Sequence, residues 1–152
     1  MPYVSLDVPT GTTPAIVRFY NEIIGTRATA GEDGGAAIAS VAAGDGQELI
    51  FRETGAPQPE FDGHHIAVYL ADFSGPYNKL LERGLITEES DQHQYRFLDI
   101  IDPDTSKAVF RLEHEVRSMR HPMYARPLVN RNPEMNNRNY VPGYQEIAWS
   151  TM

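Results

Sequence analysis

Two stretches of the chain repeat one order of predicted elements, and this duplication constrains the fold more than any other feature. Alternating apolar and polar residues predict strands, and apolar residues at three-and-four spacing predict helices. In the first half a strand, a helix and three strands are predicted in turn at residues 3–8, 14–24, 27–31, 36–42 and 47–53. The second half repeats this order at residues 65–70, 74–83, 85–87, 94–101 and 107–113.

Turn-forming residues punctuate both halves. Thr13 followed by Pro14 predicts the start of the first helix and Gly25 its end, while Ser74 and Gly84 bound the second helix. A segment rich in Gly and Pro, residues 54–63, links halves of about 1–55 and 63–115. Each βαβββ half is too small to close a core alone. We therefore expect an α+β domain over 1–115, whose paired modules form a curved mixed sheet around a cleft.

Charge separates this body from the rest of the chain. Residues 1–115 have a net charge of −11, whereas residues 116–152 form an extension rich in Arg, Asn and Pro with a net charge of +3. We expect the extension to be irregular, and either to wrap its own domain or a neighbouring subunit or to remain loose. An acidic body argues against nucleic-acid binding, which needs a basic face.

Composition excludes further classes of protein. The chain has no cysteine, which removes disulfides, thiolate metal sites and cysteine nucleophiles. No apolar stretch approaches 18 residues, so we expect no membrane span, and the first residues lack the pattern of a secretory signal. These features predict a cytoplasmic protein.

Three segments stand out for their order and spacing: FYNEIIG at 19–25, HIAVYLAD at 65–72, and DPDT at 102–105 before the last strand. Together they resemble the vicinal oxygen chelate superfamily, which includes glyoxalase I, extradiol dioxygenases and bleomycin-resistance proteins. The resemblance covers about residues 3–115. It implies a small-molecule ligand and a homodimer, since related folds commonly pair.

The resemblance also implies a set of site residues. Enzymes of the superfamily hold a divalent metal with side chains from the opening and closing strands of each half. Here those positions offer His65, Glu113 and Glu53 as ligands for Fe, Mn, Ni or Zn, with Glu53 or Glu113 as a catalytic base.

The fourth of these strand positions is occupied by Tyr3, a residue type that departs from the usual His or Gln. Tyr3, Tyr69 and Arg111 are the candidate substrate contacts. Strand alternation favours His65 over His64, and turns His114 away from Glu113.

Three functions remain open on the sequence. One is a metal-dependent enzyme, of lyase or extradiol dioxygenase type, acting on a small oxygenated or aromatic compound. The second is a metal-free small-molecule-binding protein of the bleomycin-resistance kind. The third is an interaction module whose extension docks on another subunit through its aromatic residues, Tyr124, Tyr140, Tyr144 and Trp149.

Overall fold

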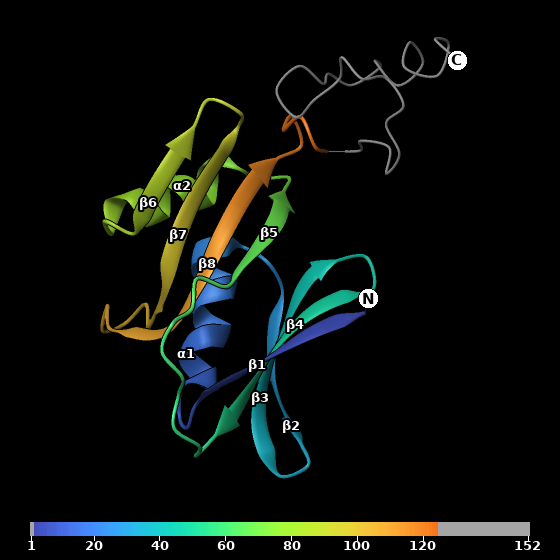
Figure 1. The fold of residues 1–152 in the computed structure, drawn as a ribbon, viewed down its shortest axis with the longest axis vertical. Coiled ribbons are helices and arrows are strands. Elements are labelled where there is room, and N and C mark those ends of the chain that lie inside the picture. The colour runs from blue at the N-terminus through green and yellow to red at the C-terminus, as the bar shows by residue number, and fades with distance from the viewer. Residues whose placement is uncertain (1, 125–152) are drawn as a thin grey trace.

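A computed structural model describes residues 2–124 of the chain (Figure 1). The first module consists of β1 (Tyr3–Pro9), α1 (Thr13–Arg18), a π-helical segment η1 (Phe19–Ile24), β2 (Ala28–Asp33), β3 (Ala36–Gly44) and β4 (Gln47–Thr54). The second consists of β5 (His65–Leu70), α2 (Ser74–Glu82), β6 (Ile86–Ser90), β7 (Gln94–Ile101) and β8 (Ala108–Ser118). The predicted α+β fold of two βαβββ modules is confirmed.

The strands form two four-stranded mixed sheets with matching topology. Sheet A has the order β1-β4-β3-β2, and sheet B has the order β5-β8-β7-β6. In each sheet the opening strand runs parallel to the closing strand, while the inner neighbours are antiparallel. The opening strands β1 and β5 therefore both lie at a sheet edge.

The first helix lies between the two sheets and joins their cores (Figure 1). Phe19 packs on Phe97 of sheet B with ring centroids 5.8 Å apart, and Tyr20 packs on Phe51 of sheet A at 5.7 Å. An ion pair of 2.9 Å between Arg18 and Asp102 ties the same helix to the end of β7. The two modules thus share one hydrophobic core, as expected for halves that cannot close a core alone.

The start of α1 is capped by a residue from another strand. The sequence predicts Thr13 as the cap, but Thr12 occupies the N-cap position, and its hydroxyl donates to the Pro9 carbonyl rather than capping the helix. Instead, the Glu53 carboxylate accepts hydrogen bonds from the backbone N–H of Thr13, at 3.0 Å, and from its hydroxyl, at 2.7 Å. A distant carboxylate therefore satisfies the first free N–H group of the helix and complements its dipole.

The end of this helix is wider than an α-helix. The N–H of Gly25 bonds to the carbonyl of Tyr20 at 2.8 Å, an i→i+5 bond, and residues 19–24 form a π-helical turn. Gly25 then ends the helix with a φ of 77°, which confirms the predicted stop. Such turns are rare and occur often at functional sites.

The second module differs from its prediction mainly at the ends of its elements. Ser74 lies inside α2, and Asp72 caps the helix by accepting a bond from the Gly75 N–H at 3.0 Å. β8 continues to Ser118, three residues beyond the expected end of the body at 115, and a turn then leads to Tyr124. Tyr140, Tyr144 and Trp149 lie outside the described residues.

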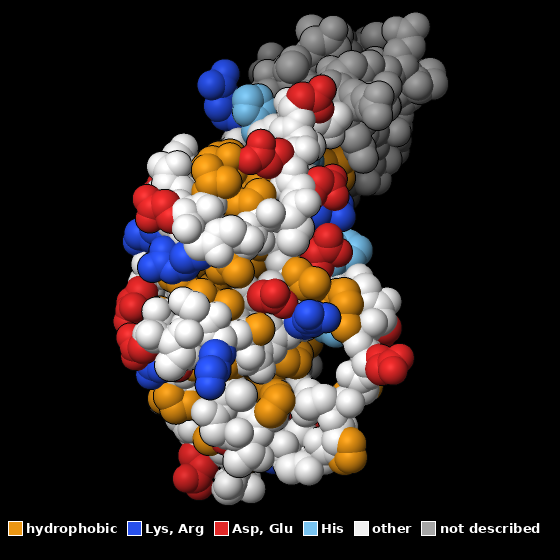
Figure 2. All heavy atoms as spheres, turned by 90° about the vertical axis from the view of Figure 1, so that its left-hand side faces the viewer, with side chains coloured by type: hydrophobic (Ala, Val, Ile, Leu, Met, Phe, Trp, Pro, Cys, Tyr) orange, Lys and Arg blue, Asp and Glu red, His pale blue; other side chains and the backbone are white. Residues whose placement is uncertain are grey.

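The described surface carries charges of both signs. On the face shown in Figure 2, described Lys and Arg side chains are interspersed with Asp and Glu, without a broad basic patch. No helix between residues 2 and 124 has the length and apolarity to cross a bilayer.

Candidate functional site

The structure brings two of the predicted metal ligands together on one face of sheet B. His65 of β5 and Glu113 of β8 are direct partners in the parallel register. Tyr69, four residues along β5, pairs with Arg117 on the same face. This face, which also carries Arg96 and Glu115, is called the charged face below.

Arginines already occupy the carboxylates of the charged face. Arg96 donates to Glu113 at 3.3 Å and to Glu115 at 2.6 Å. Arg117 also binds Glu115, and it donates to the Tyr69 hydroxyl at 3.1 Å. Glu115 is only 5% exposed, so its charge is balanced by two guanidinium groups rather than by water. The charged face is therefore a ladder of paired side chains.

The remaining predicted site residues lie elsewhere. Glu53 pairs with Val8 on the helix-facing side of sheet A, where it caps α1. Tyr3 is 56% exposed and pairs with Glu48 on the opposite side of that sheet. Arg111 is exposed and bound to Asp99 at 3.2 Å. Tyr3 and Glu53 therefore point to opposite faces of sheet A, and the structure does not bring the four expected positions to one point.

The donor set does not fit a metal centre of three protein ligands. Between residues 2 and 124, no three His, Asp or Glu side chains are arranged so that they could hold a metal ion. Glu53 is committed to its helix: burial opposes its ionisation, but hydrogen bonds from Gly11, Thr13 and Thr12 outweigh burial and lower its pKa. Glu113 is committed to Arg96.

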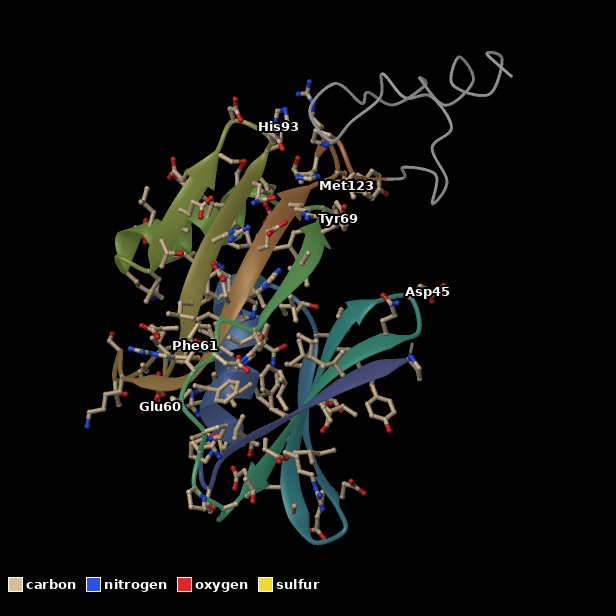
Figure 3. The ribbon with its side chains drawn as sticks, in the orientation of Figure 1. Asp45, Glu60, Phe61, Tyr69, His93 and Met123 are labelled. Carbon is tan, nitrogen blue, oxygen red and sulfur yellow. The ribbon has the colours of Figure 1, made fainter. Side chains whose placement is uncertain are left out.

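A cavity of about 320 Å³ lies between the two sheets, on the helix-facing side of both. It is bounded by the end of β3 next to the turn that Asp45 marks in Figure 3, by β5, where Tyr69 is labelled one residue before the strand ends, and by η1. Its lining is mostly apolar: Tyr20, Ile24, Thr26, Val41, Ala42, Ala43, Gly44, Leu49, Ile66, Val68, Tyr69, Leu70, Phe97, His114 and Val116. A volume of this size is within the range of small-molecule pockets.

A buried hydrogen-bonded pair forms the polar part of the cavity wall. The Tyr20 hydroxyl lies 2.5 Å from Nε2 of His114, and Nδ1 of His114 lies 2.6 Å from the carbonyl oxygen of Leu112. A carbonyl can only accept, so Nδ1 carries the proton and Nε2 accepts from the Tyr20 hydroxyl. The His114 ring is also stacked on Phe97 at 4.2 Å. The His114 ring is therefore held in place by the Leu112 carbonyl, the Tyr20 hydroxyl and the Phe97 ring.

Burial keeps both members of this pair uncharged. Desolvation raises the pKa of Tyr20 far above its ordinary value, and it lowers the pKa of His114 to about 4, against a raising effect of the bond to Leu112. At neutral pH the cavity wall thus presents a neutral phenol and a neutral imidazole.

Sequence reasoning missed this pair for a simple reason. The alternation of β8 correctly turns His114 away from Glu113, and attention to the Glu113 side left His114 without a role. The available signal was a histidine on the apolar face of a strand, together with a tyrosine on the apolar face of the first helix. Their contact, across 94 residues of sequence, needed the packing of η1 on sheet B.

Comparison with solved structures finds the same arrangement of modules. A possible glyoxalase from Bacillus cereus matches with 16% identity over 77% of this chain and 96% of that chain, at a TM-score of 0.53. A glyoxylase/bleomycin resistance protein/dioxygenase domain from Frankia sp. matches with 20% identity over 77% and 96%, at 0.51. A fosfomycin resistance protein from Listeria monocytogenes, FosX, solved with Mn(II) and dihydroxypropylphosphonic acid, matches with 13% identity over 77% and 90%, at 0.50.

Sequence comparison adds no closer assignment. No family model matches the chain, and no curated protein matches it. Identities of this size establish a common fold and leave the chemistry to the site itself. The duplicated βαβββ modules and their agreement with these structures show that the chain has the vicinal oxygen chelate fold.

Proposed function

We propose that this protein binds a small, uncharged, largely apolar molecule, without a metal ion, in the cavity between its two sheets. The observation that carries the proposal is the cavity of about 320 Å³, whose wall is formed mainly by aliphatic and aromatic side chains. Burial of apolar surface in such a site is the main source of affinity.

The lining also favours an uncharged ligand over a charged one. Among the described residues of the wall, none carries a carboxylate, an ammonium or a guanidinium group, and His114 is neutral. A charged ligand would lose its hydration without gaining a partner of opposite sign. A flat aromatic compound meets these conditions and fits the stacked rings of Phe97 and His114.

An uncharged fluorescent probe tests the proposal. N-phenyl-1-naphthylamine should bind the wild-type chain with a rise in fluorescence that saturates at one equivalent. Ala43→Phe, which places a ring in the cavity, should weaken binding about tenfold or more. Ala37→Phe is the matched control, because Ala37 lies on the same strand outside the cavity lining. Equal binding by both variants would refute the proposal.

A metal-dependent enzyme is the second candidate, and the pairing of His65 with Glu113 favours it. The Listeria neighbour was solved with Mn(II), a metal of the class that this candidate requires. The test is metal content of untagged protein after reconstitution with Fe, Mn, Ni and Zn. Binding near one equivalent that His65→Ala abolishes and His64→Ala retains would support the enzyme. Less than about a tenth of an equivalent of bound metal in the wild type would refute the metal-dependent enzyme.

We also propose a homodimer. β1 and β5 each lie at a sheet edge, and a second subunit is one way to cover such edges. Sedimentation of the full chain, whose monomer mass is 17.0 kDa, measures the assembly. A truncation that tests the extension should follow residue 124 rather than 115, because β8 runs to Ser118.

A further inference from the structure

The hydrogen bonds of the buried pair run in one direction. His114 donates from Nδ1 to Leu112, and Tyr20 donates its only hydroxyl proton to Nε2 of His114. What the Tyr20 oxygen retains is its capacity to accept. Toward the cavity, the pair therefore offers a hydrogen-bond acceptor and no donor.

Reversing this direction would leave a buried group unpaired. For Tyr20 to donate to a ligand, its proton would have to leave Nε2 of His114, which is 2% exposed and held beneath Phe97. The imidazole cannot turn over to compensate, because its other nitrogen is fixed to Leu112 at 2.6 Å. It also has no second proton to offer, since burial lowers its pKa to about 4. An unpaired buried acceptor is costly.

The other hydroxyls of the lining do not donate into the cavity. Thr26 donates to the carbonyl of Ala42 at 2.7 Å, so it too presents an acceptor. Tyr69 alternates with Val68 along β5, and its hydroxyl is bound by Arg117 on the charged face. The π-helical turn that carries Tyr20 and Ile24 brings both to the cavity wall.

We propose that the cavity selects ligands that donate a hydrogen bond, namely aromatic N–H or hydroxyl compounds, over molecules of the same shape that can only accept one. The Tyr20 oxygen is the group that accepts the ligand's hydrogen bond, and His114 is a positioning residue that fixes the direction of the Tyr20 hydroxyl. This inference rests on the proposed function, because it concerns the same cavity.

Indole and benzofuran test the inference on the wild-type chain. They are bicyclic molecules of nearly the same shape, but indole donates from its N–H, whereas benzofuran has an oxygen acceptor in that place. Displacement of N-phenyl-1-naphthylamine should show indole binding about tenfold or more tightly. Equal affinities, within about twofold, would overturn the selectivity and leave the proposed function standing. Displacement by neither compound would also overturn the selectivity, while the proposed function is judged separately by the binding of N-phenyl-1-naphthylamine itself.

A double variant locates the origin of the preference. Tyr20→Phe with His114→Leu removes both members of the pair at once, so neither is left without the other, and the Leu112 carbonyl loses its bond from His114. The preference for indole over benzofuran should fall to within about twofold. The control is Tyr95→Phe, since Tyr95 is also buried but bonds to Phe73 outside the cavity lining. An unchanged preference in the double variant would refute the role of the pair. The wild-type comparison stands even if this variant fails to fold.

Discussion

At the scale of single residues, the character of sheet B changes with each step along β8. Glu113 and Glu115 point to the charged face and are neutralised by arginines, while His114 between them is buried and hydrogen-bonded to Tyr20. Two neighbouring residues thus belong to unrelated environments, because strand side chains alternate between faces. Burial determines the protonation state of the His114 imidazole.

His114 makes stability depend on pH. Folding lowers its pKa from 6.5 to about 4, so the unfolded chain takes up the proton first as the pH falls. The stability that the neutral imidazole contributes is complete above pH 6.5 and is lost between 6.5 and 4, by about 3 kcal/mol in all. Urea unfolding across this window should show the loss in the wild type, and a smaller loss in the Tyr20→Phe/His114→Leu variant.

His121 provides the control for this measurement. Burial and the charge of Arg117 also lower its pKa, so it contributes in the same direction. His121→Gln should remove only that separate part of the dependence. If the double variant and the wild type lost stability in parallel between pH 6.5 and 4, the neutral imidazole would not be the cause.

At the scale of elements, local pattern predicts most of the fold and contacts between elements decide the rest. The strands at 65–70 and 94–101 could be predicted to the residue, because alternation and turn residues bound them. The role of Glu53 could not, since it depends on the register that places the end of β4 beside the start of α1. The π-helical turn at η1 is similar: its apolar spacing is that of an α-helix, and packing between two sheets determines its geometry.

Removing the carboxylate of Glu53 tests its role as a cap of α1. Glu53→Ala leaves the Thr13 N–H and hydroxyl without their partner, and should lower the free energy of unfolding by about 1–2 kcal/mol. Glu48→Ala on the same strand is the control, because Glu48 is exposed on the other face and should change stability by less than about 0.5 kcal/mol. Equal effects of the two substitutions in urea unfolding would contradict the capping role.

At the scale of the whole molecule, the position of α1 and η1 makes the two modules one cooperative unit. Phe19 is fully buried, and it contacts Phe97 of sheet B from a helix that belongs to the first module. Phe19→Ala should therefore destabilise both sheets together, by about 3–5 kcal/mol, whereas Leu81→Ala at a half-exposed position should have little effect.

Amide hydrogen exchange distinguishes one cooperative unit from two independent modules. In one unit, the slowest amides of β4 and β8 should open with one common free energy, and Phe19→Ala should lower their protection by the same amount. If β8 kept its protection while β4 lost it, the sheets would fold separately. A cavity bounded by both sheets would then open whenever either module unfolded, and ligand binding would protect both modules even though each unfolds alone.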